Sequence, residues 1–117
     1  MTDSTTIYHN PRCSKSRAAM ELLTDKGIEA NVVKYLDTPP DSDAISEILD
    51  MLGLEPRELM RKGEQAYKDN NLADEGLTRE QLIEAMVNHP ILIERPIVIK
   101  DGKAAIGRPI ENIIDIL

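Results

Sequence analysis

The only cysteine of the chain, Cys13, lies in the short basic segment HNPRCSKSR at residues 9–17. Arg12, Lys15 and Arg17 lie within four residues of it, and the segment contains no acidic residue. The thiolate is the nucleophilic form of cysteine, and neighbouring positive charges stabilise it. In a chain of formal net charge −7, this segment predicts a reactive thiol that meets an anionic substrate.

A lone cysteine is more often a small buried hydrophobic residue than a nucleophile. Cys13, however, lies between a predicted strand and a predicted helix, where free backbone N–H groups and the helix dipole favour an anion. We therefore expect the pKa of the Cys13 thiol to lie below its usual value of about 8.5. Cations at a helix start oppose the dipole, so Lys15 and Arg17 favour a bound oxyanion over an ordinary solvated helix start.

Cys13 and Ser16 form a C-x-x-S pattern, which is the glutaredoxin spacing with the second thiol missing. Three residues separate Cys13 from Arg17, fewer than in the phosphate-binding loop of thiol phosphatases. Because the chain has one cysteine, no second protein thiol can resolve a covalent adduct. Turnover then requires an external thiol such as glutathione.

The elements that position this segment follow from apolar spacing and turn residues. A β-prone segment at residues 5–8 runs into the turn residues NPR, and the helix that follows carries an apolar face and ends at Gly27. A second strand is predicted at residues 31–36. Two strands separated by one helix predict a right-handed parallel βαβ unit.

Residues of about 40–90 predict a helical insertion. Apolar residues at i, i+3, i+4 and i+7 mark one helix that ends at Gly53, and short helical structure is expected around Pro56 to Lys62. Thr78 and Gln81 form a capping box for a further helix that ends before Pro90.

After the insertion, Asp101-Gly102 predicts a hairpin between two short strands, and residues 110–117 repeat the helical apolar spacing. The order β-α-β, helices, β-β-α predicts an α/β fold with a mixed four-stranded sheet. At 117 residues, we expect one domain over residues 1–117.

Composition excludes several classes of function. An acidic surface repels nucleic acid and anionic lipid, no apolar run approaches the length of a membrane span, and the N-terminus lacks a signal-peptide pattern. One cysteine cannot form an internal disulfide, so we expect a reducing cytoplasm.

Four motifs together resemble the glutaredoxin-coupled arsenate reductase (ArsC) family, which has a thioredoxin-like fold with a helical insertion. They span nearly the whole chain, in the family's order: YHNPRCSKSR, LMRKG, HPILIERPIVI and IGRP. The resemblance implies reduction of arsenate, or of a similar oxyanion, through a covalent adduct on Cys13. It further implies glutathione as co-substrate and glutaredoxin as partner, with no tightly bound cofactor and no metal.

The resemblance also implies roles for individual residues. Arg61, Arg95 and Arg108 match the family's oxyanion-binding arginines, whereas from the sequence alone each reads as a helix-end or exposed loop cation. His9 matches a histidine linked to thiol activation, and Arg17 matches the arginine that closes the first motif. A further implication is that the peptide bond before Pro96 is cis.

The chain departs from the familiar pattern C-G-T-S-R at Ser14, and it ends at Leu117 without the extension of longer reductases. Two other functions therefore stay open. One is a glutathione-dependent thiol-disulfide oxidoreductase with no arsenate activity, which leaves the three arginines unexplained. The other is a redox regulator like Spx that binds RNA polymerase, although such regulators carry a C-x-x-C switch and this chain has Ser16.

Overall fold

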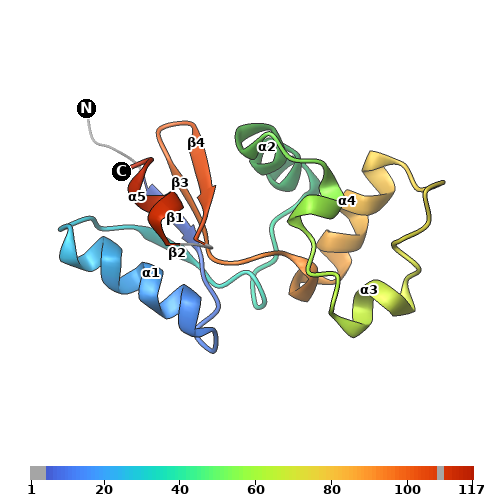
Figure 1. Ribbon diagram of the computed structural model, residues 1–117, viewed down its shortest axis with the longest axis horizontal. Helices are drawn as coiled ribbons and strands as arrows, with labels where there is room; N and C mark the ends of the chain where they lie inside the picture. The colour runs from blue at the N-terminus through green and yellow to red at the C-terminus, as the bar shows by residue number, and fades with distance from the viewer. Residues whose placement is uncertain (1–4, 108–109) are drawn as a thin grey trace. The chain divides into compact units, whose positions relative to one another are not determined.

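The computed structural model describes residues 5–107 and 110–117 (Figure 1). The chain divides into two compact units: a first unit of Met1–Thr38 with Arg95–Leu117, and a second unit of Pro39–Glu94. The second unit is the helical insertion expected at about 40–90. That residues 1–117 behave as one domain stays a prediction.

The first unit contains a four-stranded sheet with strand order β2-β1-β3-β4. β1 and β2 are parallel, while β1 with β3 and β3 with β4 are antiparallel, which confirms the predicted mixed sheet. Its elements are β1 (Thr5–Tyr8), α1 (Ser14–Asp25), β2 (Asn31–Val33), β3 (Ile97–Lys100), β4 (Lys103–Ile106) and α5 (Glu111–Ile114).

Two of these elements are shorter than predicted. The second strand ends at Val33 rather than at residue 36, because the amides of Asp37 and Thr38 both donate to the Lys34 carbonyl and turn the chain. The last helix covers only four of the eight residues expected.

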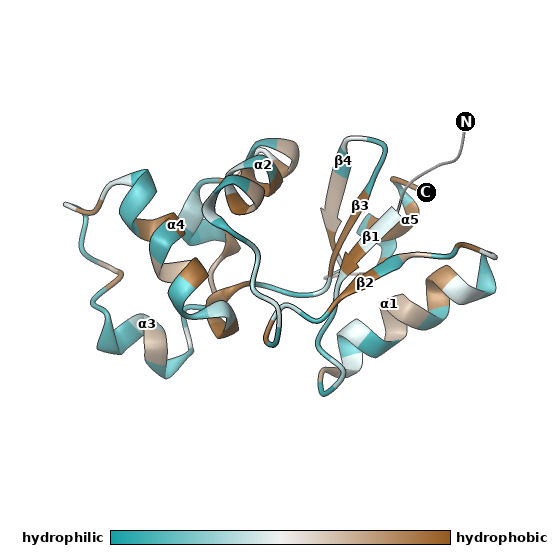
Figure 2. Cartoon of the chain, turned by 180° about the vertical axis from the view of Figure 1, so that it is seen from behind, coloured by the Kyte–Doolittle hydropathy of each residue, from teal (hydrophilic) through white to brown (hydrophobic). Residues whose placement is uncertain are grey.

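The core of the first unit lies on one face of the sheet. Ile7 pairs with Val98, and Val98 with Ala105, so these three side chains share a face. Figure 2 shows hydrophobic residues along β1 and β3. Both α1 and α5 cover this face, through Ala19, Leu23 and Ile113, all buried.

The β3–β4 hairpin turns at the predicted dipeptide. Asp101 and Gly102 both have positive φ, at 51° and 78°, as a two-residue type I′ turn requires. The predicted turn is therefore confirmed.

The second unit is helical, and its buried residues come mainly from the facing sides of α2 and α4. Asp41 caps α2, Gly53 ends it with φ 69°, and Thr78 and Gln81 form the predicted capping box at α4. Its elements are α2 (Ser42–Leu52), η1 (Pro56–Leu59), α3 (Gln65–Asp69), α4 (Arg79–Asn88) and η2 (Pro90–Leu92). Within residues 5–107 and 110–117, no helix combines the length and the apolar composition that crossing a membrane requires.

Candidate active site

The strands of the first unit bring two of the predicted site segments to one edge of the sheet. Tyr8 pairs with Val33 of β2 and with Ile97 of β3, and Ile97 pairs with Ile106 of β4. The residues that follow β1, β2 and β4 and those that precede β3 therefore leave the sheet at the same edge. The Cys13 segment follows β1, and Arg95 and Pro96 precede β3.

Cys13 is the N-cap residue of α1, with an extended backbone at φ −94° and ψ 123°. Its carbonyl accepts the amide hydrogen of Arg17 at 3.0 Å, which opens the helix, and its own amide donates to the Asn10 carbonyl at 3.0 Å. The side chain is buried, with 8% of its surface exposed. The expected place between strand and helix is confirmed, and the nucleophilic role stays a prediction.

Ser16, which occupies the second-thiol position of the C-x-x-S pattern, holds the segment together. Its side chain is fully buried, and its Oγ accepts the amide hydrogen of Asn10 at 3.0 Å. The same Oγ lies 2.6 Å from Nδ1 of His9. A hydroxyl that accepts one hydrogen bond can still donate another, so Ser16 links the end of β1 to the first turn of α1. In the sequence, the only signal for this structural role was the position of Ser16 in the C-x-x-S pattern.

His9 is buried, and its amide donates to the Val33 carbonyl at 2.8 Å. Burial lowers the pKa of His9 from its ordinary 6.5, and the positive charges of Lys34 and Arg17 lower it further. The lowered pKa favours the neutral form of the ring at pH 7. Through Ser16 the ring contacts the turn that carries Cys13.

Arg17 closes the turn from the other side. Its Nη1 donates to the Pro11 carbonyl at 2.9 Å, while the amide of Arg12 donates to Oδ1 of Asn10 at 3.0 Å. Both arginine side chains are exposed. The hydrogen bonds within residues 9–17 thus fix the direction in which the backbone enters α1.

Arg95 is a buried arginine, 9% exposed, in the segment that leads into β3. The Arg95–Pro96 peptide bond is cis, as predicted. The Pro96 carbonyl accepts the amide hydrogen of Gly107 at 2.9 Å, which joins this segment to the end of β4. The third predicted arginine, Arg108, follows Gly107 and lies outside the described residues.

Arg61 belongs to the second unit. Its Nη1 donates to Oε1 of Glu64 at 2.7 Å, and its Nε lies 4.0 Å from Oε1 of Glu94. Its amide donates to the Leu92 carbonyl at 2.7 Å. The expectation that Arg61 joins Cys13 stays a prediction.

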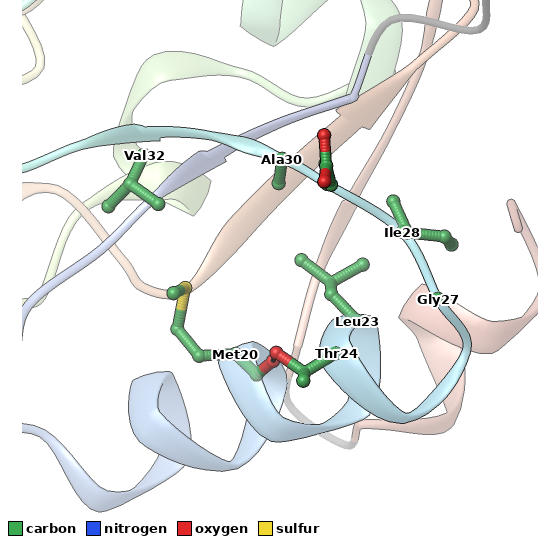
Figure 3. Close-up of a pocket in the computed structure, with 8 residues that line it drawn as sticks. Met20, Leu23, Thr24, Gly27, Ile28, Ala30 and Val32 are labelled. Atoms are coloured by element: carbon green, nitrogen blue, oxygen red, sulfur yellow. Dashed lines mark hydrogen bonds between the residues drawn. The ribbon is translucent and has the colours of Figure 1, made fainter.

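The described residues of the first unit line at least two pockets. One, of about 420 Å³, is lined mainly by apolar side chains between α1 and β2, with Glu29 as its only charged residue (Figure 3). Another, of about 330 Å³, lies against residues 9–12 of the Cys13 segment. Within the described part of the chain, no group of three or more His, Cys, Asp or Glu side chains is placed to hold a metal ion.

The ArsC family model matches residues 8–116, which include every segment of this site. The chain belongs to the ArsC family. The expected family and the thioredoxin-like fold are therefore confirmed.

Named relatives of this ArsC protein include arsenate reductases. A protein of Neisseria meningitidis serogroup A named arsenate reductase is 53% identical over 95% of this chain and 96% of its own. An uncharacterised Escherichia coli K12 protein, YfgD, is 52% identical over 100% of this chain and 99% of its own. A solved structure titled arsenate reductase, from Vibrio cholerae, is 47% identical with a TM-score of 0.96 and covers all of both chains.

This ArsC fold thus gathers Cys13, His9 and Arg17 in one turn and brings Arg95 to the same sheet edge. A thiol at a helix N-terminus beside arginines can attack an electrophilic oxyanion and hold its negative oxygens. The structure adds Ser16 and Lys34 to the residues that shape the site.

Proposed function

We propose that this protein reduces arsenate to arsenite, with Cys13 as the nucleophile. The observation that carries the proposal is the position of the single thiol at the start of α1, at the sheet edge where Arg95 also lies. The arsenate reductase names of relatives at about half sequence identity support it. We expect the enzyme to work in a reducing compartment, the cytoplasm.

The first step is a substitution at arsenic without change of oxidation state. The Cys13 thiolate attacks arsenic(V), a sulfur–arsenic bond forms, and one arsenic–oxygen bond breaks as the oxygen leaves as water after protonation. Backbone N–H groups at the start of α1 and the Arg95 guanidinium stabilise the oxygens that remain. We expect Arg61 and Arg108, which match the family pattern, to serve as further oxyanion ligands.

The second stage reduces arsenic(V) to arsenic(III) and needs two electrons from outside the chain, because the chain has one cysteine. Two external thiols supply them and end as one disulfide, so that arsenate and two thiols give arsenite, a disulfide and water. We propose glutathione as the thiol that attacks the Cys13 adduct and glutaredoxin as the partner that removes the bound glutathione. No tightly bound cofactor is needed.

The test is arsenate-dependent oxidation of NADPH in the presence of glutathione, glutaredoxin and glutathione reductase. Cys13→Ser should abolish turnover, and Arg95→Ala should raise the apparent KM for arsenate about tenfold or more. Arg95→Lys keeps the charge but loses the guanidinium fork, so its KM for arsenate should lie between those of the wild-type protein and Arg95→Ala. Arg79→Ala, which removes an arginine paired with Asp50 in the second unit, is the matched control and should keep the wild-type KM. Equal rates for the wild-type protein and Cys13→Ser would refute the proposal.

A second candidate uses the same thiol without arsenic. A helix N-terminal cysteine with C-x-x-S spacing also suits exchange with glutathione disulfide. The intact mass of the protein after oxidised glutathione, compared with its mass after arsenate and reduced glutathione, separates the two. A glutathione adduct formed from the disulfide, together with no arsenite from arsenate, would favour this candidate.

A further inference from the structure

The pocket of about 330 Å³ beside the Cys13 segment has two walls that both belong to the first unit. Residues 9–12, which lead directly into Cys13, form one wall. Lys34, Leu36 and Asp37 form the other. Whatever binds in this pocket therefore contacts the segment that leads into Cys13.

Both walls are held in place by backbone hydrogen bonds. The amide of His9 donates to the Val33 carbonyl at 2.8 Å, which ties the start of one wall to the residue before Lys34. The Asp37 amide donates to the Lys34 carbonyl at 2.9 Å, so residues 34–37 form a turn. The pocket is a built feature of the sheet edge and does not depend on exposed side chains alone.

The charges that line the pocket have both signs. Arg12 and Lys34 are cationic, Asp37 is anionic, and all three side chains are exposed. Among the described residues, none of the three forms an ion pair. The side chain of Leu36, 41% exposed, adds an apolar surface between the charged groups.

The mixed charges of this pocket favour a zwitterionic ligand over a simple anion. A compact dianion such as arsenate would be repelled by Asp37, whereas a flexible zwitterion can place its carboxylates on the cations and its ammonium on Asp37. Glutathione is such a molecule: it carries two carboxylates, one ammonium group and a central thiol at neutral pH. The larger pocket of Figure 3 offers no cation to a carboxylate.

We propose that this pocket is the docking site for glutathione, which rests on the proposed function in that the bound thiol is the one that attacks the Cys13 adduct. The carboxylates of glutathione bind Arg12 and Lys34, and its α-ammonium binds Asp37. Leu36 contacts the methylene groups between them. Arg12 is thereby a specificity residue for the thiol rather than for the oxyanion.

Binding is measured by titrating S-methylglutathione, which cannot react, into the full chain in a calorimeter. Lys34→Ala and Arg12→Ala should each weaken Kd about threefold to tenfold, because each removes one carboxylate contact. Lys34→Arg should retain most of the affinity. Lys26→Ala, which removes an exposed lysine at the end of α1, is the matched control and should leave Kd unchanged.

The role of Asp37 is tested with a second ligand, N-acetyl-S-methylglutathione, which lacks the ammonium group. Asp37→Asn should weaken the binding of S-methylglutathione and leave the Kd of the acetylated ligand unchanged. Equal effects on both ligands would contradict the assignment of the ammonium to Asp37.

Turnover with two thiols separates this inference from the proposed function. With glutathione, Lys34→Ala should raise the apparent KM of the thiol more than the apparent KM of arsenate. With uncharged 2-mercaptoethanol, the apparent KM of the thiol should stay constant. Two results would overturn the pocket assignment and leave the proposed function standing, provided that the protein turns over arsenate. One is a Kd for S-methylglutathione that neither Lys34→Ala nor Arg12→Ala changes. The other is no measurable binding of S-methylglutathione. Binding that depends on Lys34, without arsenate turnover, would support the pocket and refute the proposed function.

Discussion

Ser16 stands where a two-cysteine protein carries its second thiol, and here its hydroxyl holds the turn that contains Cys13. It accepts from the Asn10 amide and contacts His9. The absence of the second thiol therefore has two consequences: the proposed reaction needs reducing electrons from outside the chain, and the serine at this position supports the loop.

At the scale of this residue, Ser16→Ala should destabilise the protein by about 1–3 kcal/mol, because it leaves the Asn10 amide and the buried His9 ring without their hydrogen-bonding partner. Ser14→Ala is the control, since Ser14 is exposed in the same helical turn. Urea denaturation of both variants measures the difference. Equal losses of unfolding free energy would contradict the role assigned to the Ser16 hydroxyl.

The pKa of His9 depends on the positive charge of Lys34. Burial is the main cause of the lowered pKa of His9, and the positive charge of Lys34 contributes next. Removing that charge makes protonation easier, so Lys34→Ala should raise the pKa of His9 toward 6.5 without reaching it, since burial remains. An NMR titration measures this shift readily, because the chain has only two histidines.

Lys26→Ala is the control for that titration and should leave the pKa of His9 at its wild-type value. A pKa that falls or stays constant in Lys34→Ala would show that the Lys34 charge does not act on the ring.

At the scale of elements, the sheet edge depends on close contact between the end of β4 and the segment before β3. An added Cβ at Gly107 would lie 2.7 Å from the Pro96 ring and 2.7 Å from the Ile113 side chain. Gly107→Ala should therefore destabilise the protein by about 1–3 kcal/mol through overpacking. Gly63→Ala is the matched control, because a Cβ there meets no atom within 4 Å.

Thermal unfolding of the two glycine variants measures the effect. A further readout is the apparent KM for arsenate, which Gly107→Ala should raise if the segment carrying Arg95 moves. Gly107→Ala with wild-type stability and wild-type KM would contradict the tight packing at this edge.

Helices and strands whose apolar residues repeat at a regular spacing, or that are bounded by typical turn residues, were predictable from the sequence. α2 has a regular apolar face and a glycine stop, and the β3–β4 hairpin has its Asp101-Gly102 turn. α3 was not predictable because it is five residues long and buries none of them. β2 ends early because residues 34–38 prefer a local turn to the sheet, which propensity alone does not reveal.

The candidate site was predictable to a similar extent. The place of Cys13 between strand and helix follows from local patterns, and the cis bond before Pro96 from the family resemblance. The contact of Ser16 with His9 and the pocket beside Lys34 depend on how β1, β2 and α1 pack. No local pattern contains that information.

At the scale of the whole molecule, the expectation of a single domain can be tested through its two units. Leu49 is fully buried in the second unit, and Leu49→Ala should cost about 2–5 kcal/mol. If the chain unfolds as one domain, the denaturation midpoint reported by amides of the first unit should fall together with that of the second. A midpoint that falls in the second unit alone would show two independent domains.

The central claim is that the Cys13 thiol carries arsenate reduction with electrons from external thiols. The most direct measurement is the amount of arsenite and of glutathione disulfide formed from arsenate, glutathione and glutaredoxin. Arsenite is determined by chromatography with elemental detection of arsenic, and glutathione disulfide by chromatography with ultraviolet detection. We predict one disulfide per arsenite with the wild-type protein and no arsenite above the protein-free background with Cys13→Ser. Arsenite formed by Cys13→Ser at the wild-type rate would contradict the claim.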